Sequence, residues 1–69
     1  MVAKITNTVR ELRDAQNHMT QQALAEAIGV SRQTINAIET GKYQPSLEVA
    51  LKIAQTFDQS LESIFQLKD

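Results

Sequence analysis

Residues 20–41, TQQALAEAIGVSRQTINAIETG, constrain the fold of this 69-residue chain more than any other stretch. Each half begins with a hydroxyl residue, Thr20 or Ser31, of the kind that caps a helix by accepting a backbone N–H. An apolar residue precedes each cap and another follows the cap four places later. These pairs are Met19 with Leu24 and Val30 with Ile35. Because such a hydrophobic staple fixes how the chain enters a helix, the stretch predicts a helix, a tight turn and a second helix.

The residues inside this stretch suit a steep crossing of the two helices. Helices over about residues 21–28 and 32–40 leave a short turn, in which Gly29 tolerates a positive φ without the steric penalty of a Cβ. Ala25 is small enough for close approach where the helices cross. The apolar residues expected to close the angle are Leu24, Ile28, Val30, Ile35 and Ile38. This pattern is typical of the helix-turn-helix, whose second helix projects and can lie in the major groove of DNA.

A further helix is predicted before this pair, over residues 8–17. Thr8 and Glu11 have the spacing of a capping box, and Val9 and Leu12 face inward. Gly41 is expected to provide the left-handed end of the third helix.

Two helices are predicted after the pair, which gives an all-α fold with five helices. Ser46 is expected to cap a fourth helix that ends at Phe57, and Ser60 a short fifth one. The apolar residues at helical spacing are Leu47, Ala50, Leu51, Ala54 and Phe57, then Leu61 and Ile64. Residues 3–5 and 65–68 alternate apolar and polar residues, so we expect them to pair as short antiparallel strands. Frayed tails are the alternative.

Composition narrows the environment and the partners. The chain has no cysteine, which suits a reducing compartment such as the cytoplasm. It has no apolar run near the ~20 residues of a membrane span and no signal-peptide core, so we expect one cytoplasmic domain over residues 1–69. The net charge is −1, which argues against holding nucleic acid by bulk attraction. Residues 1–44 carry five basic and four acidic groups and residues 45–69 two and four, so any nucleic-acid surface should lie in the first part.

One face of the predicted third helix carries side chains that can read base pairs. With Ile35 and Ile38 inward, a rotation of about 100° per residue turns the neighbouring positions outward. The outward residues are Arg32, Gln33, Asn36 and Ala37. Arginine can bond bidentately to guanine, glutamine or asparagine to adenine, and alanine can contact a thymine methyl group. Taken singly, each polar residue could belong to an ordinary solvated face, but the absence of a carboxylate before Glu39 favours DNA.

Other residues lie where the DNA backbone would pass. Gln21 and Gln22 open the second helix and Ser31 precedes the third, where backbone amides can meet a phosphate. Lys42 and Tyr43 follow the third helix, next to the same backbone. Such contacts would orient the protein without reading sequence. Alternatively, Lys42 is a plain surface lysine and the Tyr43 ring packs beneath the loop.

The segment TQQALAEAIGVSRQTINAIETGKYQPSLEVALKIA, with the terminal IFQLKD, resembles the Xre/Cro type of helix-turn-helix regulators over about residues 4–68. In fold this family is similar to the DNA-binding domains of the phage lambda and 434 repressors. The resemblance implies a five-helix domain that binds a palindromic operator as a homodimer, with residues 32, 33, 36 and 37 near base edges. It also implies phosphate contacts from Gln21, Thr34, Thr40, Lys42 and Tyr43.

Two positions depart from the usual pattern of that family. His18 stands where a glycine commonly ends the first helix, so Asn17 could take the left-handed conformation instead. Asp58–Gln59 replace a glycine or asparagine followed by an apolar residue, which weakens the staple before the fifth helix.

The last segment is the best candidate for pairing two copies, because one recognition helix buries too little to bind an operator tightly. The candidate interface residues are Leu61, Ile64, Phe65 and Leu67. The alternative is that all four complete the core of the monomer.

The sequence gives little support to catalysis or metal binding, since His18 is the only histidine and no carboxylate pair accompanies a nucleophile. We therefore predict a regulator of transcription, most simply a repressor, that is not an enzyme. Its partner would be double-stranded DNA, with no cofactor, metal, membrane or small-molecule ligand. A protein-interaction module such as an antitoxin is the alternative, and a restriction-modification controller would be a third possibility that still binds DNA.

Overall fold

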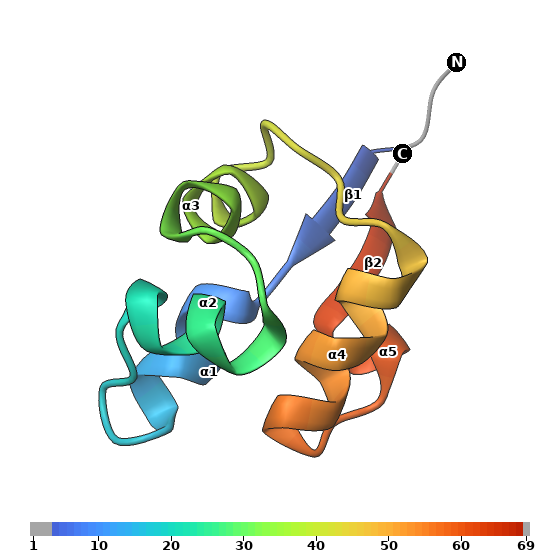
Figure 1. Cartoon of the computed structure of the whole chain (residues 1–69). Helices are drawn as coiled ribbons and strands as arrows, with labels where there is room; N and C mark the ends of the chain where they lie inside the picture. Colours follow the sequence, from blue (N-terminus) through green and yellow to red (C-terminus); the bar gives the residue numbers. More distant parts are fainter. Residues whose placement is uncertain (1–3, 69) are drawn as a thin grey trace.

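The computed structural model describes residues 4–68 and shows five short helices with two terminal strands (Figure 1). In chain order these are β1 (Lys4–Asn7), α1 (Val9–Ala15), α2 (Gln21–Ile28), α3 (Arg32–Glu39), α4 (Leu47–Phe57), α5 (Leu61–Ile64) and β2 (Phe65–Lys68). In Figure 1, α3 lies on one side of the molecule and α4 with α5 on the other. The predicted fold class, five helices with a short antiparallel pair of strands, is confirmed.

Four helices begin at the hydroxyl caps that the sequence predicts. The capping oxygens of Thr20, Ser31, Ser46 and Ser60 accept the backbone N–H groups of Ala23, Thr34, Val49 and Ser63 at 2.9, 3.1, 3.2 and 3.2 Å. Each bond satisfies one of the amides that a helix leaves without an internal partner in its first turn. Local chemistry therefore sets the start of α2, α3, α4 and α5.

The predicted capping box at the start of α1 is wrong. The Thr8 side chain makes no capping bond, and the Val9 N–H donates instead to Asn7 Oδ1 at 3.1 Å. Asn7 is also held from the other side, since its Nδ2 donates to the Ile38 carbonyl at 3.0 Å. Asn7 thus joins β1, the start of α1 and the last turn of α3. The spacing of a capping box could not predict this role, because the bond to Ile38 is made by a residue distant in the sequence.

The end of α1 also differs from the prediction. The helix stops at Ala15 rather than Asn17, because Asn17 and His18 both have a φ of 55°. The left-handed conformation predicted for Asn17 is confirmed, and His18 shares it. Two consecutive left-handed residues turn the chain out of the helix before Met19 re-enters the core.

The core lies between the helices and is mainly aliphatic. Its buried members are Val9, Leu24, Ala25, Ile28, Ile35, Ile38, Ile53, Ala54, Phe57 and Ile64. Met19 and Val30, the outer residues of the two staples, pack against it. The turn before α3 contains Gly29 with a φ of 79°, which a side chain would strain. The crossing of α2 and α3 is therefore fixed by packing and by one permissive residue.

The inward face of α4 is rotated from the predicted one. Its buried residues are Ala50, Ile53, Ala54 and Phe57, whereas Leu47 and Leu51 are 67% and 51% exposed. Ile53, which the prediction omitted, is fully buried, at the edge of this stripe that lies farthest from Leu51. At about 100° per residue, Leu51 lies roughly 100° from that stripe, which leaves it on the surface.

The two strands pair antiparallel, which excludes frayed ends over the described residues. The register pairs Lys4 with Lys68, Ile5 with Leu67, Thr6 with Gln66 and Asn7 with Phe65. Ala3, which we predicted to belong to the first strand, lies outside the described residues. Because side chains alternate between the faces of a sheet, Ile5, Phe65 and Leu67 share one face.

Candidate nucleic-acid interface

The outer face of α3 presents the residues that the sequence predicts for reading bases. Arg32, Gln33 and Asn36 are exposed and Ala37 is half-buried, while the opposite face is fully packed in the core. The helix projects at one side of the molecule, away from α4 and α5 (Figure 1). The structure thus brings these four residues together on one accessible surface.

The N-terminal ends of α2 and α3 suit an anion. Neither helix has an acidic residue in its first turn, and in each only one first-turn amide is capped by a side chain. The first amides of a helix have no partner within it, and the helix dipole adds a partial positive charge there. Both ends can therefore bind phosphate through the backbone, although the net charge of the chain is negative.

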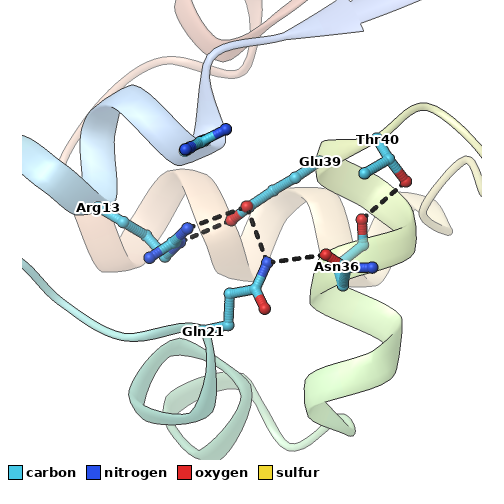
Figure 2. A pocket seen from close by; sticks show the side chains of 6 residues that line it. Arg13, Gln21, Asn36, Glu39 and Thr40 are labelled. Atoms are coloured by element: carbon cyan, nitrogen blue, oxygen red, sulfur yellow. Dashed lines mark hydrogen bonds and ion pairs between the residues drawn. The ribbon is translucent and has the colours of Figure 1, made fainter.

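A buried ion pair joins α1 to α3 beside this surface (Figure 2). The Arg13 Nε lies 2.6 Å from Glu39 Oε2 and Nη2 lies 3.0 Å from Oε1, with side-chain exposures of only 11% and 5%. The remaining Arg13 nitrogen, Nη1, donates to the Met19 carbonyl at 2.7 Å. The hydrogen bond to Glu39 raises the pKa of Arg13, with attraction from Glu39 and Asp14 adding to the effect and burial opposing it. Arg13 is therefore a fixed positive charge that holds the end of α3.

Gln21 extends this network from α2 to the reading face. Its Nε2 donates to Glu39 Oε1 at 3.1 Å and to Asn36 Oδ1 at 3.2 Å (Figure 2). These residues border a polar pocket of about 330 Å³, whose lining residues are Arg10, Arg13, Gln21, Asn36, Glu39 and Thr40. Through Gln21, the buried Arg13–Glu39 pair is thus linked to Asn36 on the outer face of α3.

Reasoning from the sequence missed this network and misplaced one of its members. We treated Glu39 as the first carboxylate on the outer face, but its side chain turns inward to Arg13. A signal was present: Arg13 follows the buried Val9 by four residues, so it lies on the inward stripe of α1. A cation at such a position needs an acidic partner, and Glu39 follows the buried Ile35 by the same interval.

Several predicted phosphate-contacting groups are already engaged in local hydrogen bonds. The hydroxyls of Ser31 and Thr34 lie 2.9 Å apart, so one of the two protons is used between them. The Thr40 hydroxyl donates to the Asn36 carbonyl at 2.9 Å. Gln22 donates to Glu26 at 2.9 Å and keeps one amide proton.

The loop after α3 leaves its two predicted contacts accessible. Lys42 is exposed and takes part in neither of the ion pairs found within residues 4–68. Tyr43 is 47% exposed, so its ring is not sealed beneath the loop. The backbone N–H groups of both residues donate to the Ala37 carbonyl, at 2.9 and 3.2 Å, and fix the turn. The backbone of both residues therefore lies beside the last turn of α3.

The four residues predicted for pairing two copies divide into two groups. Ile64 is fully buried and belongs to the core of the monomer, which contradicts its assignment to a surface. Leu61 and Phe65 are half-buried and Leu67 is 74% exposed. Beside them lies a mainly apolar depression lined by Ile5, Gln44, Pro45, Leu47, Ala50, Leu61 and Phe65. An apolar surface therefore continues from β2 to the start of α4.

Residues 4–68, the part of the chain that the structure describes, also bear on metal binding and on membrane spans. No three histidine, cysteine, aspartate or glutamate side chains gather there as metal ligands. None of the helices there is both long and apolar enough to cross a bilayer.

Comparison with known proteins agrees with this geometry. A family model described as helix-turn-helix matches residues 9–64. An uncharacterized HTH-type transcriptional regulator of Methanocaldococcus jannaschii is 54% identical over 55 residues, which cover 80% of this chain and 83% of that one. Another, YgzD of Bacillus subtilis, is 48% identical over 63 residues, covering 91% and 94%. A crystal structure of a candidate DNA-binding protein from Bacteroides fragilis superposes with a TM-score of 0.77 at 27% identity, covering 90% of this chain and 98% of that one.

Proposed function

The chain belongs to the Xre/Cro type of the helix-turn-helix family and is a DNA-binding, non-enzymatic regulator of transcription, and from this premise we propose that it is a repressor that occupies a palindromic operator as a homodimer. The observation that carries the proposal is the outer face of α3. Arg32, Gln33 and Asn36 are exposed there on a helix whose other face is anchored in the core. Such a helix enters the major groove with its first turns against the base edges.

Specific reading comes from the side chains of α3. Arg32 donates to guanine, Gln33 reads an adenine or another base edge, and Ala37 contacts a thymine methyl group. The amides at the starts of α2 and α3, with Gln22, Lys42 and Tyr43, hold the flanking phosphates. One of the Ser31 and Thr34 hydroxyls keeps a free proton for a phosphate, whereas the Thr40 hydroxyl joins only after its local bond rearranges.

Pairing uses the apolar surface on the other side of the molecule. Leu61, Phe65 and Leu67 supply it from α5 and β2, and the exposed Leu47 and Leu51 extend it along α4. A group of exposed leucines favours a contact between copies, because a second copy that covers them removes their apolar surface from water. A two-fold axis through this surface presents two α3 helices to half-sites about one helical turn, ~34 Å, apart.

A compact regulator of this kind represses by occupying the operator and blocking polymerase. Occupancy of the operator would rise with protein concentration and with pairing, and a signal could act through another protein or through the terminal surface. The protein acts in the compartment that holds the DNA, the cytoplasm.

Selection from random double-stranded DNA tests this function. The full chain is mixed with a randomised duplex library, bound DNA is recovered by gel shift, and several rounds are sequenced. We expect enrichment of one inverted repeat with half-sites about one helical turn apart. Absence of enrichment at low salt would contradict operator binding and would favour a protein partner for the same scaffold.

A further inference from the structure

The ion pair of α1 and α3 determines which way the Gln21 amide faces. Glu39 accepts Arg13 on both carboxylate oxygens, at 2.6 and 3.0 Å, so it is ionised and can only accept. Gln21 touches the same Oε1 at 3.1 Å, and only an amide N–H can make that bond. The Gln21 nitrogen, rather than its oxygen, must therefore point into the site.

The same nitrogen then determines which way Asn36 faces. One Gln21 proton is used on Glu39, and the second reaches the Asn36 side chain at 3.2 Å. Because this partner is a donor, Asn36 must offer Oδ1 to it. The Nδ2 group of Asn36 consequently points away from Gln21, as Figure 2 shows. A series of hydrogen bonds thus runs from Arg13 through Glu39 and Gln21 to Asn36. Through it, the buried ion pair determines whether the Asn36 side chain offers its oxygen or its nitrogen to a base.

This orientation changes which base Asn36 can read. Bidentate reading of adenine needs the asparagine oxygen to accept from N6 and the nitrogen to donate to N7. Here Oδ1 is turned towards Gln21, so the two N–H donors of Nδ2 are left for a base, and guanine presents two acceptors, N7 and O6. We propose, on the basis of the operator-binding function above, that Gln21 fixes Asn36 as a donor and makes it select guanine over adenine. Asn36 is then a specificity residue and Gln21 the residue that positions it.

The same bonds revise the role that the sequence predicted for Gln21. Both of its amide protons are used, and its remaining oxygen would repel a phosphate. Phosphate at the start of α2 is therefore held by the backbone amides rather than by this side chain. Gln21 acts on sequence preference through Asn36.

The test is a comparison of base preferences by parallel selection and by titration of the selected duplex. Asn36→Ala first identifies the base pair that Asn36 reads, as the position whose preference it lowers. Gln21→Met then removes the donor while keeping a long, unbranched side chain with good helix propensity. Gln55→Met, the same change at an exposed position of α4, is the matched control.

At the position identified by Asn36→Ala, the wild-type protein should bind the guanine duplex about tenfold more tightly than the adenine duplex. Gln21→Met should lower that ratio about fivefold, since the Asn36 amide can then turn its oxygen outward at the cost of no hydrogen bond. Gln55→Met should leave the ratio unchanged.

Each contrary outcome has a separate meaning. Absence of any selected sequence for the wild-type protein would refute operator binding itself. A selected operator with adenine at the Asn36 position would refute the donor assignment alone. An Asn36→Ala preference identical to that of the wild type, or an unchanged ratio in Gln21→Met, would equally overturn it.

Discussion

Removal of the Glu39 charge should destabilise the fold far more than removal of any exposed carboxylate. Glu39→Gln keeps the shape of the side chain but leaves the Arg13 cation, 11% exposed, without a counter-charge and places an amide N–H among donors. Loss of one partner from a buried pair costs about 3 kcal/mol or more. The free energy of unfolding of a domain of this size is about 3–10 kcal/mol, so a large part of the stability should disappear.

Urea denaturation followed by far-ultraviolet circular dichroism measures this loss at one fixed protein concentration. With a denaturant slope of ~1 kcal/mol per molar, the midpoint should fall by about 3 M. Glu48→Gln is the matched control, since Glu48 pairs with Lys52 on the surface with side-chain exposures of 76% and 46%, and it should cost no more than about 0.5 kcal/mol. Adding Arg13→Met to Glu39→Gln should restore at least about half of the loss, because the buried cation is then gone.

Equal losses for Glu39→Gln and Glu48→Gln would refute this reasoning. Loss of stability in Glu39→Gln with no recovery in the double variant would also refute it, since the cost would then come from packing rather than from an unpaired charge.

Four further substitutions test other parts of the molecule. Arg32→Ala should cost ~1–3 kcal/mol of binding free energy on the selected operator and relax the preference at one base pair per half-site. Lys42→Ala should instead weaken binding to all sequences alike and lower the salt dependence of binding by about one. Equal losses of affinity for operator and random DNA in gel-shift titrations of Arg32→Ala would contradict its base-reading role. Leu67→Glu, at a position 74% exposed, should yield a folded monomer in analytical ultracentrifugation, since burying an unpaired carboxylate in an apolar contact is costly. A variant that stays dimeric would exclude this surface as the dimer interface. His18→Gly should raise the free energy of unfolding by up to about 1 kcal/mol, since His18 has a φ of 55°; a loss of stability in urea would show that the imidazole makes a contact that matters.

The parts of the fold set by short-range chemistry could be predicted from the sequence. The caps at Thr20, Ser31, Ser46 and Ser60 were predicted correctly because each needs only a hydroxyl and a backbone amide three residues later, ahead of an apolar helical pattern. The reading face followed from helical rotation, since Ile35 and Ile38 leave only one side of α3 open.

The features of the site that the sequence analysis missed depend on partners that are distant in the sequence. Asn7 replaced Thr8 as the cap of α1 because it also bonds Ile38, 31 residues away. Arg13 and Glu39 are 26 residues apart, and only the packing of α1 on α3 brings them together. The orientation of the Asn36 amide depends in turn on that pair. Residue types showed which groups could touch DNA, but long-range contacts decide how one of them is presented.

Methylation interference on the selected operator tests most directly that the face of α3 lies in the major groove. Dimethyl sulfate modifies guanine N7 in the major groove and adenine N3 in the minor groove, so the two grooves are probed in one reaction. Our account predicts that guanine N7 methylation blocks binding in two patches about one helical turn apart on one side of the duplex. Interference confined to adenine N3, or a single unsymmetrical patch, would contradict it.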